Sequence, residues 1–523
     1  MRILILTGKQ SYSILRGIAE SIKIHNIEVY KLQVSISAFI TPKMTEDTLN
    51  SLELTKYDLI LLPGFIQWDL SKIENKYNLP IRKGPEFASD LPMILNNLGE
   101  IELSNKIAAN KLFELSGEKK YSELVVERID KAKENISHNT FFLNKQISDI
   151  IIGPSLPPPI IAEIVNCTKK SDNSILRKAQ HYINSGADII DIGCLANKSE
   201  PSRVKEIIKI LRKNFDVLIS IDSMDTREIF SALEEGIDMI LSIDIGNYRE
   251  LLDLPKDIPI VILPTNIDEG YFPKDPESRV ENLFELTAKL QKNGFTKLIA
   301  DPLLETPISP GILNSLQAYY LYNLKSSQNE HNHLKLPMFF GISNVVELMD
   351  IDSIGINGLL AAIAIELDMG ILFTVEHSTK MMNGVRELKE AVKLNYLSKS
   401  NNTPPINQGI QYFKAKGKTS QDIPDIVDKN ILKVEEIIES YIQDEKGYFK
   451  IYVNHYHRQI RVLFYSNDNI HKKTIIGIEA EAISKKIIEL NLTNDIHHIN
   501  YLGRELKKAE ICLDSGKPYI QDE

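Results

Sequence analysis

Eight apolar runs between Ile160 and His377 constrain what this chain can fold into. Each run ends in a polar or acidic cluster, and stretches with helical periodicity separate one run from the next. Strands that alternate with helices in this way form parallel sheets, and eight such units close into a (β/α)₈ barrel, which carries its active site at the carboxyl ends of the strands. The middle of the chain is therefore predicted to be a TIM barrel whose chemistry comes from the residues that end the runs: Asn166, Asp191, Asp222, Asp244, Asn247, Asn266, Asp301, Asn344, Glu376 and His377.

The composition limits the partners that this chain can have. Its 61 Lys and Arg against 71 Asp and Glu give a net charge of −10 without a basic tail or patch, which argues against nucleic acid or an anionic membrane surface as a partner. The three cysteines lie far apart and show no metal-ligand spacing. No run approaches the roughly 18 apolar residues that span a bilayer, and no leader-like segment precedes the first strand. We therefore expect a cytoplasmic protein.

Breaks in periodicity divide the chain into three domains and a linker. Residues 1–103 show the βαβ rhythm of a small parallel α/β domain of Rossmann or flavodoxin type. Residues 104–152 are rich in Lys and Glu and are predicted to be a helical linker. The barrel occupies residues 153–397, after a proline-rich entry. Residues 406–523 are predicted to form an α+β domain, with a first helix over 425–441, two strands and two later helices.

Asp222 and Asp301 are the strongest ligand-binding candidates at the rim of the predicted barrel. They end strands three and six, on opposite sides of the mouth, and each follows an apolar run. A carboxylate at the edge of a dry core is costly unless a ligand or a neighbour supplies donors. Two such carboxylates suit a flat heterocycle with amino and ring N–H groups, such as a pterin or a guanine. The alternative is that either residue caps the next helix.

Four phrases of the barrel resemble dihydropteroate synthase, in the same order and at comparable spacing: GADIIDIG, ISIDS, ADP and PMFFGIS. Together they are typical of the pterin-binding barrel superfamily, which also includes pterin-dependent methyltransferases. The whole chain resembles more closely the dihydropteroate synthase-like proteins of methanogenic archaea, through KGPEFASDLP in the first domain, TVEHSTK in the barrel and YLGRELKKAE near the end. Those proteins are associated with tetrahydromethanopterin.

The resemblance implies a partial active site. By resemblance, Asp222 and Asp301 would hold the pterin ring, with Asn247 and Asn344 on the same wall, and Asn166 would lie beside Mg²⁺ and the pyrophosphate of the substrate. Mg²⁺ prefers oxygen ligands and is often held by few protein groups together with substrate phosphates. The expected cofactor is therefore Mg²⁺, and the expected ligand is a reduced pterin.

The chain departs from the synthase where the leaving group would bind. The synthase phrase Asn-x-Thr-Pro-Asp-Ser-Phe becomes NCTKKSDN, in which Lys169 and Lys170 would neutralise a phosphate instead. The Arg-x-His pair of strand eight becomes EHSTK, in which His377, Ser378 and Lys380 would rebuild an anion site at a helix N-terminus. His377 is also a candidate acid or base, against a purely structural role.

These observations favour a dihydropteroate synthase-like transferase of tetrahydromethanopterin biosynthesis, which condenses a dihydropterin methyl pyrophosphate with a phosphorylated arylamine. Two alternatives stay open. One is a methyltransferase-type barrel that exchanges a methyl group with a reduced pterin, with a corrinoid protein as partner. The other is a pterin-binding protein without catalysis. By analogy with the superfamily, the default assembly is a homodimer.

Overall fold

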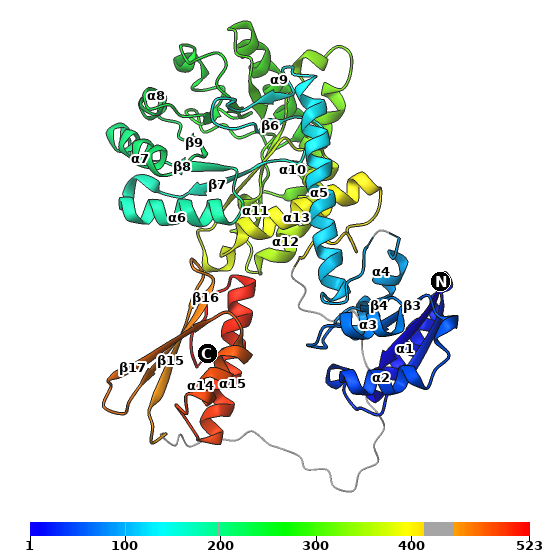
Figure 1. Cartoon of the computed structure of the whole chain (residues 1–523). Helices are drawn as coiled ribbons and strands as arrows, with labels where there is room; N and C mark the ends of the chain where they lie inside the picture. The colour runs from blue at the N-terminus through cyan, green and yellow to red at the C-terminus, as the bar shows by residue number, and fades with distance from the viewer. Residues whose placement is uncertain (100, 197, 413–443, 523) are drawn as a thin grey trace. The chain divides into compact units, whose positions relative to one another are not determined.

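The described part of the chain divides into two compact units (Figure 1). The computed structural model describes residues 1–99, 101–196, 198–412 and 444–522. The first unit comprises Met1–Val126 and the described part of Leu397–Asp425, and the second comprises Glu127–Tyr396 and the described part of Ile426–Glu523. Within the described ranges, no helix has the length and apolar character needed to cross a membrane.

The first unit contains a four-stranded parallel sheet, as the βαβ rhythm predicts. The sheet order is β2-β1-β3-β4. The run Leu59–Leu62 is apolar at every position because helices cover both faces of a parallel sheet. The strands are β1 (Arg2–Thr7), β2 (Asn26–Lys31), β3 (Leu59–Leu62) and β4 (Ile81–Lys83), and the helices are α1 (Lys9–Ser21), α2 (Pro42–Asn50), α3 (Ser71–Tyr77) and α4 (Leu91–Asn96).

The predicted helical linker is helical only in its first part. Helix α5 ends at Lys133, having begun at Ala109, and a two-stranded hairpin follows, β5 (Phe141–Phe142) with β6 (Ile151–Ile152). The prediction of helix up to residue 151 was wrong because the apolar pairs of this hairpin pack into the interior of the barrel rather than along a helix.

The second unit contains the predicted barrel. The strand order is β12-β11-β10-β9-β8-β7-β14-β13, all neighbours are parallel, and a bridge from Ala300 to Met338 joins the two end strands. Its strands are β7 (Ile160–Ile164), β8 (Ile189–Gly193), β9 (Leu218–Asp222), β10 (Met239–Ile243), β11 (Ile260–Ile262), β12 (Leu298–Ala300), β13 (Phe339–Gly341) and β14 (Ile371–Val375). The expected TIM-barrel fold is confirmed.

Helices surround the strands of the barrel (Figure 1). Only a short 3-10 turn, Tyr248–Leu251, occupies the connection from β10 to β11. The helices are α6 (Asp172–Asn184), α7 (Pro201–Asn214), α8 (Thr226–Glu234), α9 (Pro276–Lys292), α10 (Ile312–Ser326), α11 (Ser343–Val346), α12 (Ser353–Glu366) and α13 (Gly384–Asn401).

The β5–β6 hairpin closes the amino-terminal end of the barrel. Phe141, Leu143 and Ile152 belong to the same apolar cluster as the first inward-facing residues of the barrel strands. Next to them, the Asn144 amide donates to the Asp238 carboxylate at 2.7 Å, directly before β10. The interior is therefore sealed at this end, and its polar residues lie towards the other.

The last part of the chain is an antiparallel sheet with two helices on one face, which confirms the predicted α+β class (Figure 1). Buried side chains alternate along β16, and they pack on the two helices. The third strand was not predicted, and the helix predicted over 425–441 lies outside the described residues. The elements are β15 (Tyr448–Asn454), β16 (Gln459–Tyr465), β17 (His471–Gly477), α14 (Ala480–Glu489) and α15 (Ile496–Ser515).

Candidate functional site

Three carboxyl groups converge inside the mouth of the barrel. Glu163 on β7, Asp191 on β8 and Asp222 at the end of β9 each offer one oxygen, and these oxygens lie within 4.8 Å of one another. The strands are neighbours in the sheet, with Glu163 directly opposite Asp191 in the parallel register and Gly193 opposite Asp222. We call Glu163, Asp191 and Asp222 the carboxyl triad.

The carboxyl triad receives little help from the protein around it. The Ser220 hydroxyl donates to Asp191 Oδ1, whereas Asp191 Oδ2 is buried without a partner. The structure gives the side chains of Glu163 and Asp222 no hydrogen bond within the described ranges. Five of the six oxygens therefore lack a protein donor in the described ranges, and one of them, Asp191 Oδ2, is fully buried, where polar groups are normally satisfied.

Burial and mutual repulsion hold protons on this cluster. Burial raises the pKa of Glu163 to about 8, with repulsion from the Asp222 carboxylate as the second cause. Burial also raises the pKa of Asp222 to about 6 and that of Asp191 well above its ordinary value. None of the Lys, Arg or His residues in the described ranges lowers these pKa values. Such shifts are frequent in functional sites.

Gly193 leaves the space that the Glu163 carboxyl occupies. A Cβ at position 193 would lie 1.9 Å from Glu163 Oε1. Real side chains do not approach so closely, so residue 193 must lack a side chain for Glu163 to point into the barrel. The glycine that ends the GADIIDIG phrase is thus part of the site's construction.

Asp301 lies at the end of β12, with one oxygen committed and one available. Oδ1 accepts from the Leu303 backbone N–H at 2.8 Å and lies 2.9 Å from the Tyr319 hydroxyl, while Oδ2 has no hydrogen bond within the described ranges. Burial raises the pKa of Asp301 to about 6, against the lowering effect of these donors. Neither Asp301 nor Asp222 caps the next helix: Asp225 is the N-cap of α8, which follows Asp222, and Gly311 is the N-cap of α10, which follows Asp301. Both remain candidates for ligand binding.

A buried arginine fixes the loop that follows Asp301. Arg279, only 1% exposed, donates to the carbonyl oxygens of Pro273 at 2.9 Å and Leu303 at 2.9 Å, and it pairs with the Glu305 carboxylate. A buried guanidinium with its donors satisfied is a rigid support. The position of the Asp301 backbone therefore does not depend on a ligand.

The two amides predicted on the pterin wall are already engaged. Asn247 is buried, and its Oδ1 accepts from the Asp244 backbone N–H at 2.9 Å. Asp244 in turn accepts from Thr265 and Ile267, so this pair holds the β10 turn together. The Asn344 side chain is exposed, and its amide donates to the Leu304 carbonyl at 3.0 Å.

The loop after β7 exposes Asn166 and Lys169 and buries Cys167 and Thr168. Asn166 has a left-handed backbone with φ 51°, and its side chain has no hydrogen bond within the described ranges. Lys169 is also exposed, and Lys170 is half-buried with its carbonyl accepting from Arg203 at 2.9 Å. As a ligand for Mg²⁺, Asn166 offers a single exposed amide oxygen, which fits only a cation whose other ligands come from water or substrate.

Glu347 occupies the donors of the anion site predicted after β14. Its Oε1 accepts from the backbone N–H groups of His377 at 2.9 Å and Ser378 at 3.1 Å, and the Lys380 amine bonds the Met349 carbonyl. The amides and the amine that would bind a phosphate thus have partners within the protein, whereas the buried Ser378 hydroxyl has none in the described ranges. The imidazole of His377 is exposed.

Glu376, the last acidic rim residue, is structural. It is 9% exposed and bonds the Lys178 amine at 3.2 Å, the His181 ring at 2.7 Å and the Val385 backbone N–H at 3.2 Å. These partners lower the pKa of Glu376 in spite of its burial. Glu376 thus contrasts with the carboxyl triad, whose charges have no such partners.

Sequence reasoning missed Glu163. It stands in the middle of the apolar run IIAEIVNCT, where a charged residue has no place unless it serves a site. Residues of a strand alternate between its two faces, and Ile161, two positions earlier, faces the interior. That spacing would have placed Glu163 inside the barrel.

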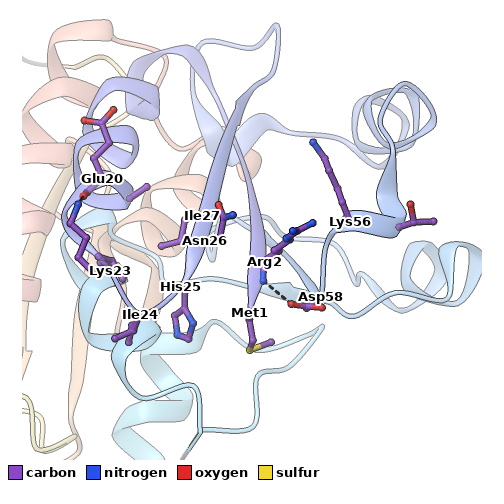
Figure 2. A pocket seen from close by; sticks show the side chains of 13 residues that line it. Met1, Arg2, Glu20, Lys23, Ile24, His25, Asn26, Ile27, Lys56 and Asp58 are labelled. Carbon is purple, nitrogen blue, oxygen red and sulfur yellow. Dashed lines mark hydrogen bonds between the residues drawn. The ribbon is translucent and has the colours of Figure 1, made fainter.

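The first unit has a shallow hollow of about 820 Å³ (Figure 2). It lies around Met1, Asn26 and Asp58, at the amino ends of the parallel strands, and the Arg2 backbone N–H donates there to Asp58 at 2.6 Å. Ligands of parallel α/β sheets bind at the carboxyl ends instead. We assign no function to this hollow.

Three family models match parts of the chain. The one described as pterin binding enzyme matches residues 164–355, from β7 into α12. A family of unknown function, DUF6513, matches residues 1–86, and PterinBD-DUF4346 matches residues 443–522.

Among solved structures, the chain is similar to dihydropteroate synthases. That of Yersinia pestis is 19% identical, with 50% of this chain and 100% of that chain covered and a TM-score of 0.37. That of Xanthomonas albilineans in complex with 7,8-dihydropteroate is 17% identical, with 47% and 94% covered and a TM-score of 0.36.

A curated relative is similar over the full length. The uncharacterized protein MJ0107 of Methanocaldococcus jannaschii is 35% identical, and the match covers 100% of this chain and 98% of the relative. The chain therefore belongs to the same family as this Methanocaldococcus protein, and its central barrel is a pterin-binding enzyme domain.

Proposed function

We propose that this protein is a dihydropteroate synthase-like transferase of tetrahydromethanopterin biosynthesis. It would join a dihydropterin methyl pyrophosphate to an arylamine and release pyrophosphate. The observation that carries the proposal is the pair of rim carboxyls, Asp222 and Asp301, which offer unfilled acceptor oxygens at the mouth of a pterin-binding barrel.

A pterin supplies what these oxygens lack. Its amino group and ring N–H groups are donors along one flat edge, and a carboxylate can accept two of them in parallel. Asp301 would use Oδ2, because Oδ1 is committed to Leu303 and Tyr319. Donors from the ligand would lower the pKa of Asp301 from about 6 and favour its charged form.

The reaction needs positioning more than covalent catalysis. The bond between the methylene carbon and the pyrophosphate oxygen breaks, and its electron pair leaves with pyrophosphate. The amine nitrogen then bonds the methylene carbon and loses a proton to water. Mg²⁺, when bound, would neutralise pyrophosphate oxygens, and Asn166 is the ligand that the resemblance assigns. The protein orients the two substrates and excludes water.

Lys169 and Lys170 bear on the choice of amine. They follow β7 at the carboxyl end of the barrel, and the nearby amides after β14 are already filled by Glu347. The amines of these two lysines make no hydrogen bond or salt bridge within the described ranges, although Lys169 lowers the pKa of Glu200. They favour a phosphorylated arylamine, such as ribofuranosyl-aminobenzene phosphate, over aminobenzoate.

The test is pyrophosphate release by the full-length protein from dihydropterin methyl pyrophosphate with Mg²⁺. Three reactions are compared, with ribofuranosyl-aminobenzene phosphate, with aminobenzoate and without amine. Release that depends on the phosphorylated amine, is lost in Asp301→Asn and persists in Asp268→Asn supports the proposal. Asp268 is an exposed carboxylate at the same rim and serves as a matched control. No release with any amine refutes it.

One observation favours a second candidate, a methyltransferase-type barrel. Glu347 fills the donors that would bind a leaving pyrophosphate after β14, and a methyl group that moves to or from a reduced pterin needs no such site. This candidate predicts tight binding of a methylated reduced pterin without pyrophosphate. Pterin binding without turnover in either assay would leave the non-catalytic alternative.

A further inference from the structure

The carboxyl triad, Glu163, Asp191 and Asp222, is built to converge on one point. One oxygen from each of three adjacent strands lies within 4.8 Å of the other two. Oxygen ligands around one Mg²⁺, Mn²⁺ or Ca²⁺ ion are about 3–5 Å apart, given metal–oxygen distances of roughly 2.0–2.6 Å. The spacing of the triad therefore needs little adjustment to surround a single ion.

Asp191 points to a missing partner independently of that spacing. Its side chain is 0% exposed, the Ser220 hydroxyl holds Oδ1, and Oδ2 has no partner although it is buried. A buried polar atom without a partner costs about 1–3 kcal/mol, and a charged one costs more. Asp191 Oδ2 is therefore an unfilled acceptor position in the interior of the barrel, which suits a cation.

The surrounding barrel supports the same placement. Gly193 has no side chain, and Glu163 Oε1 fills the space where its Cβ would be. Ser220 fixes the orientation of Asp191, as hydrogen bonds behind metal ligands commonly do. By contrast, buried Glu376 has Lys178 and His181 as counter-charges. The triad has no counterpart to these within the described residues.

We infer that Glu163, Asp191 and Asp222 bind one divalent cation inside the mouth of the barrel. The set contains only oxygen ligands, which suits Mg²⁺, Mn²⁺ or Ca²⁺ better than zinc, whose protein sites nearly always include histidine or cysteine. The cation supplies the positive charge that the three strands lack.

Two other occupants account less well for this arrangement. Protons alone would neutralise the triad, and the raised pKa of Glu163, about 8, fits that state in the empty protein. A proton serves one or two oxygens at a time, whereas one cation contacts an oxygen of all three residues. A pterin edge spreads its donors along a line of several ångströms, whereas the triad converges on a point. Asp222 would give one oxygen to the ion, and its other oxygen and Asp301 on β12 would stay available for the ring.

This inference does not depend on the proposed function, because the cation ligands are assigned from the barrel alone. It changes the expected metal site, however. The exposed Asn166 would become an outer neighbour, and the ion would be held by carboxylates deep in the mouth. An ion there would face the anionic part of a substrate bound above it.

The experiment is a titration of chelator-treated, full-length protein with Mn²⁺ and no pterin, followed by the electron paramagnetic resonance signal of free Mn²⁺. We expect one bound Mn²⁺ per chain, displaced by Mg²⁺, and binding at least about 10-fold weaker in Glu163→Gln and Asp191→Asn. Asp268→Asn carries the same type of change at an exposed rim position and should bind like the wild type. Circular dichroism verifies that each variant is folded.

The outcomes separate this inference from the proposed function. Mn²⁺ binding lost in Glu163→Gln but kept in Asp268→Asn supports the cation site, whether or not pterin binds. Absence of bound Mn²⁺ in the wild type, or equal binding in Glu163→Gln, overturns it. Pterin binding, measured separately by fluorescence with Asp301→Asn, decides the proposed function alone.

Discussion

Replacing Glu163 by Gln should stabilise the barrel at alkaline pH. The raised pKa of Glu163 means that the folded protein holds a proton that the unfolded chain releases at its ordinary pKa of 4.5. The stability that this proton contributes is fully present below pH 4.5 and is lost as the pH rises towards 8. Gln is neutral at every pH, so the free energy of unfolding of the variant does not fall in this way as the pH rises.

The magnitude follows from the two pKa values. A rise from 4.5 to about 8, at about 1.36 kcal/mol per pKa unit, corresponds to about 5 kcal/mol over the full range. Between pH 5 and pH 8.5 the expected gain of Glu163→Gln over the wild type is about 3–4 kcal/mol. The cost of packing the Gln amide is the same at both pH values, so it cancels when the difference between variant and wild type at pH 5 is subtracted from that at pH 8.5. For a barrel of this size the gain corresponds to roughly 10 °C in melting temperature.

The assay must report on the barrel. The single tryptophan, Trp68, lies in the first unit, so its fluorescence does not follow barrel unfolding. Hydrogen exchange of peptides from β7 to β9, or calorimetry with a chelator present, does. A difference between Glu163→Gln and the wild type that is the same at pH 5 and pH 8.5 would refute the reasoning, since Glu163 would then be ionised with adequate partners. Asp268→Asn should show no pH-dependent difference.

Three further changes test the surroundings of the site. Gly193→Ala should destabilise the barrel by about 1–3 kcal/mol through its clash with Glu163, and calorimetry of a double-mutant cycle should show that the cost vanishes in the Glu163→Ala background. Tyr319→Phe removes a donor that lowers the pKa of Asp301, so the midpoint of pterin binding against pH should move upward from about 6; an unmoved midpoint would exclude Asp301 as the group observed. Arg279→Met leaves buried carbonyl oxygens and the Glu305 carboxylate without their donor. Chemical denaturation should therefore show a free energy of unfolding lower by about 3–5 kcal/mol. An unchanged value would mean that the loop does not need the guanidinium.

The barrel could be predicted from the sequence because its signal is repeated. Eight apolar runs, nearly all of them followed by a helix, leave few alternatives, and parallel strands buried on both faces are the easiest strands to recognise. Asp222 and Asp301 could be predicted as rim residues for the same reason, since a polar residue after an apolar run marks the end of a strand.

The parts that were missed lack such a signal. The strands of the β5–β6 hairpin are two residues long, too short for any periodicity, and their place is set by contacts with distant strands. Strand β17 buries Ile475 alone, so its sequence does not alternate visibly. Glu163 was treated as part of an apolar run, and the contact that Glu347 makes from another loop with the backbone N–H groups after β14 could not be predicted. Tertiary contacts of this kind are not encoded locally.

The β5–β6 hairpin, which packs against the first residues of the barrel strands, also determines the end from which a ligand can enter the barrel. Phe141, Leu143 and Ile152 fill the amino-terminal end of the described barrel, so ligands enter its interior from the carboxyl ends of the strands. If a pterin binds across the mouth as proposed, whatever occupies the position beside the fully buried Asp191 would arrive before the pterin and depart after it. The ligand that binds first would then dissociate last, so two ligands that do not touch each other would still bind and dissociate in a fixed order.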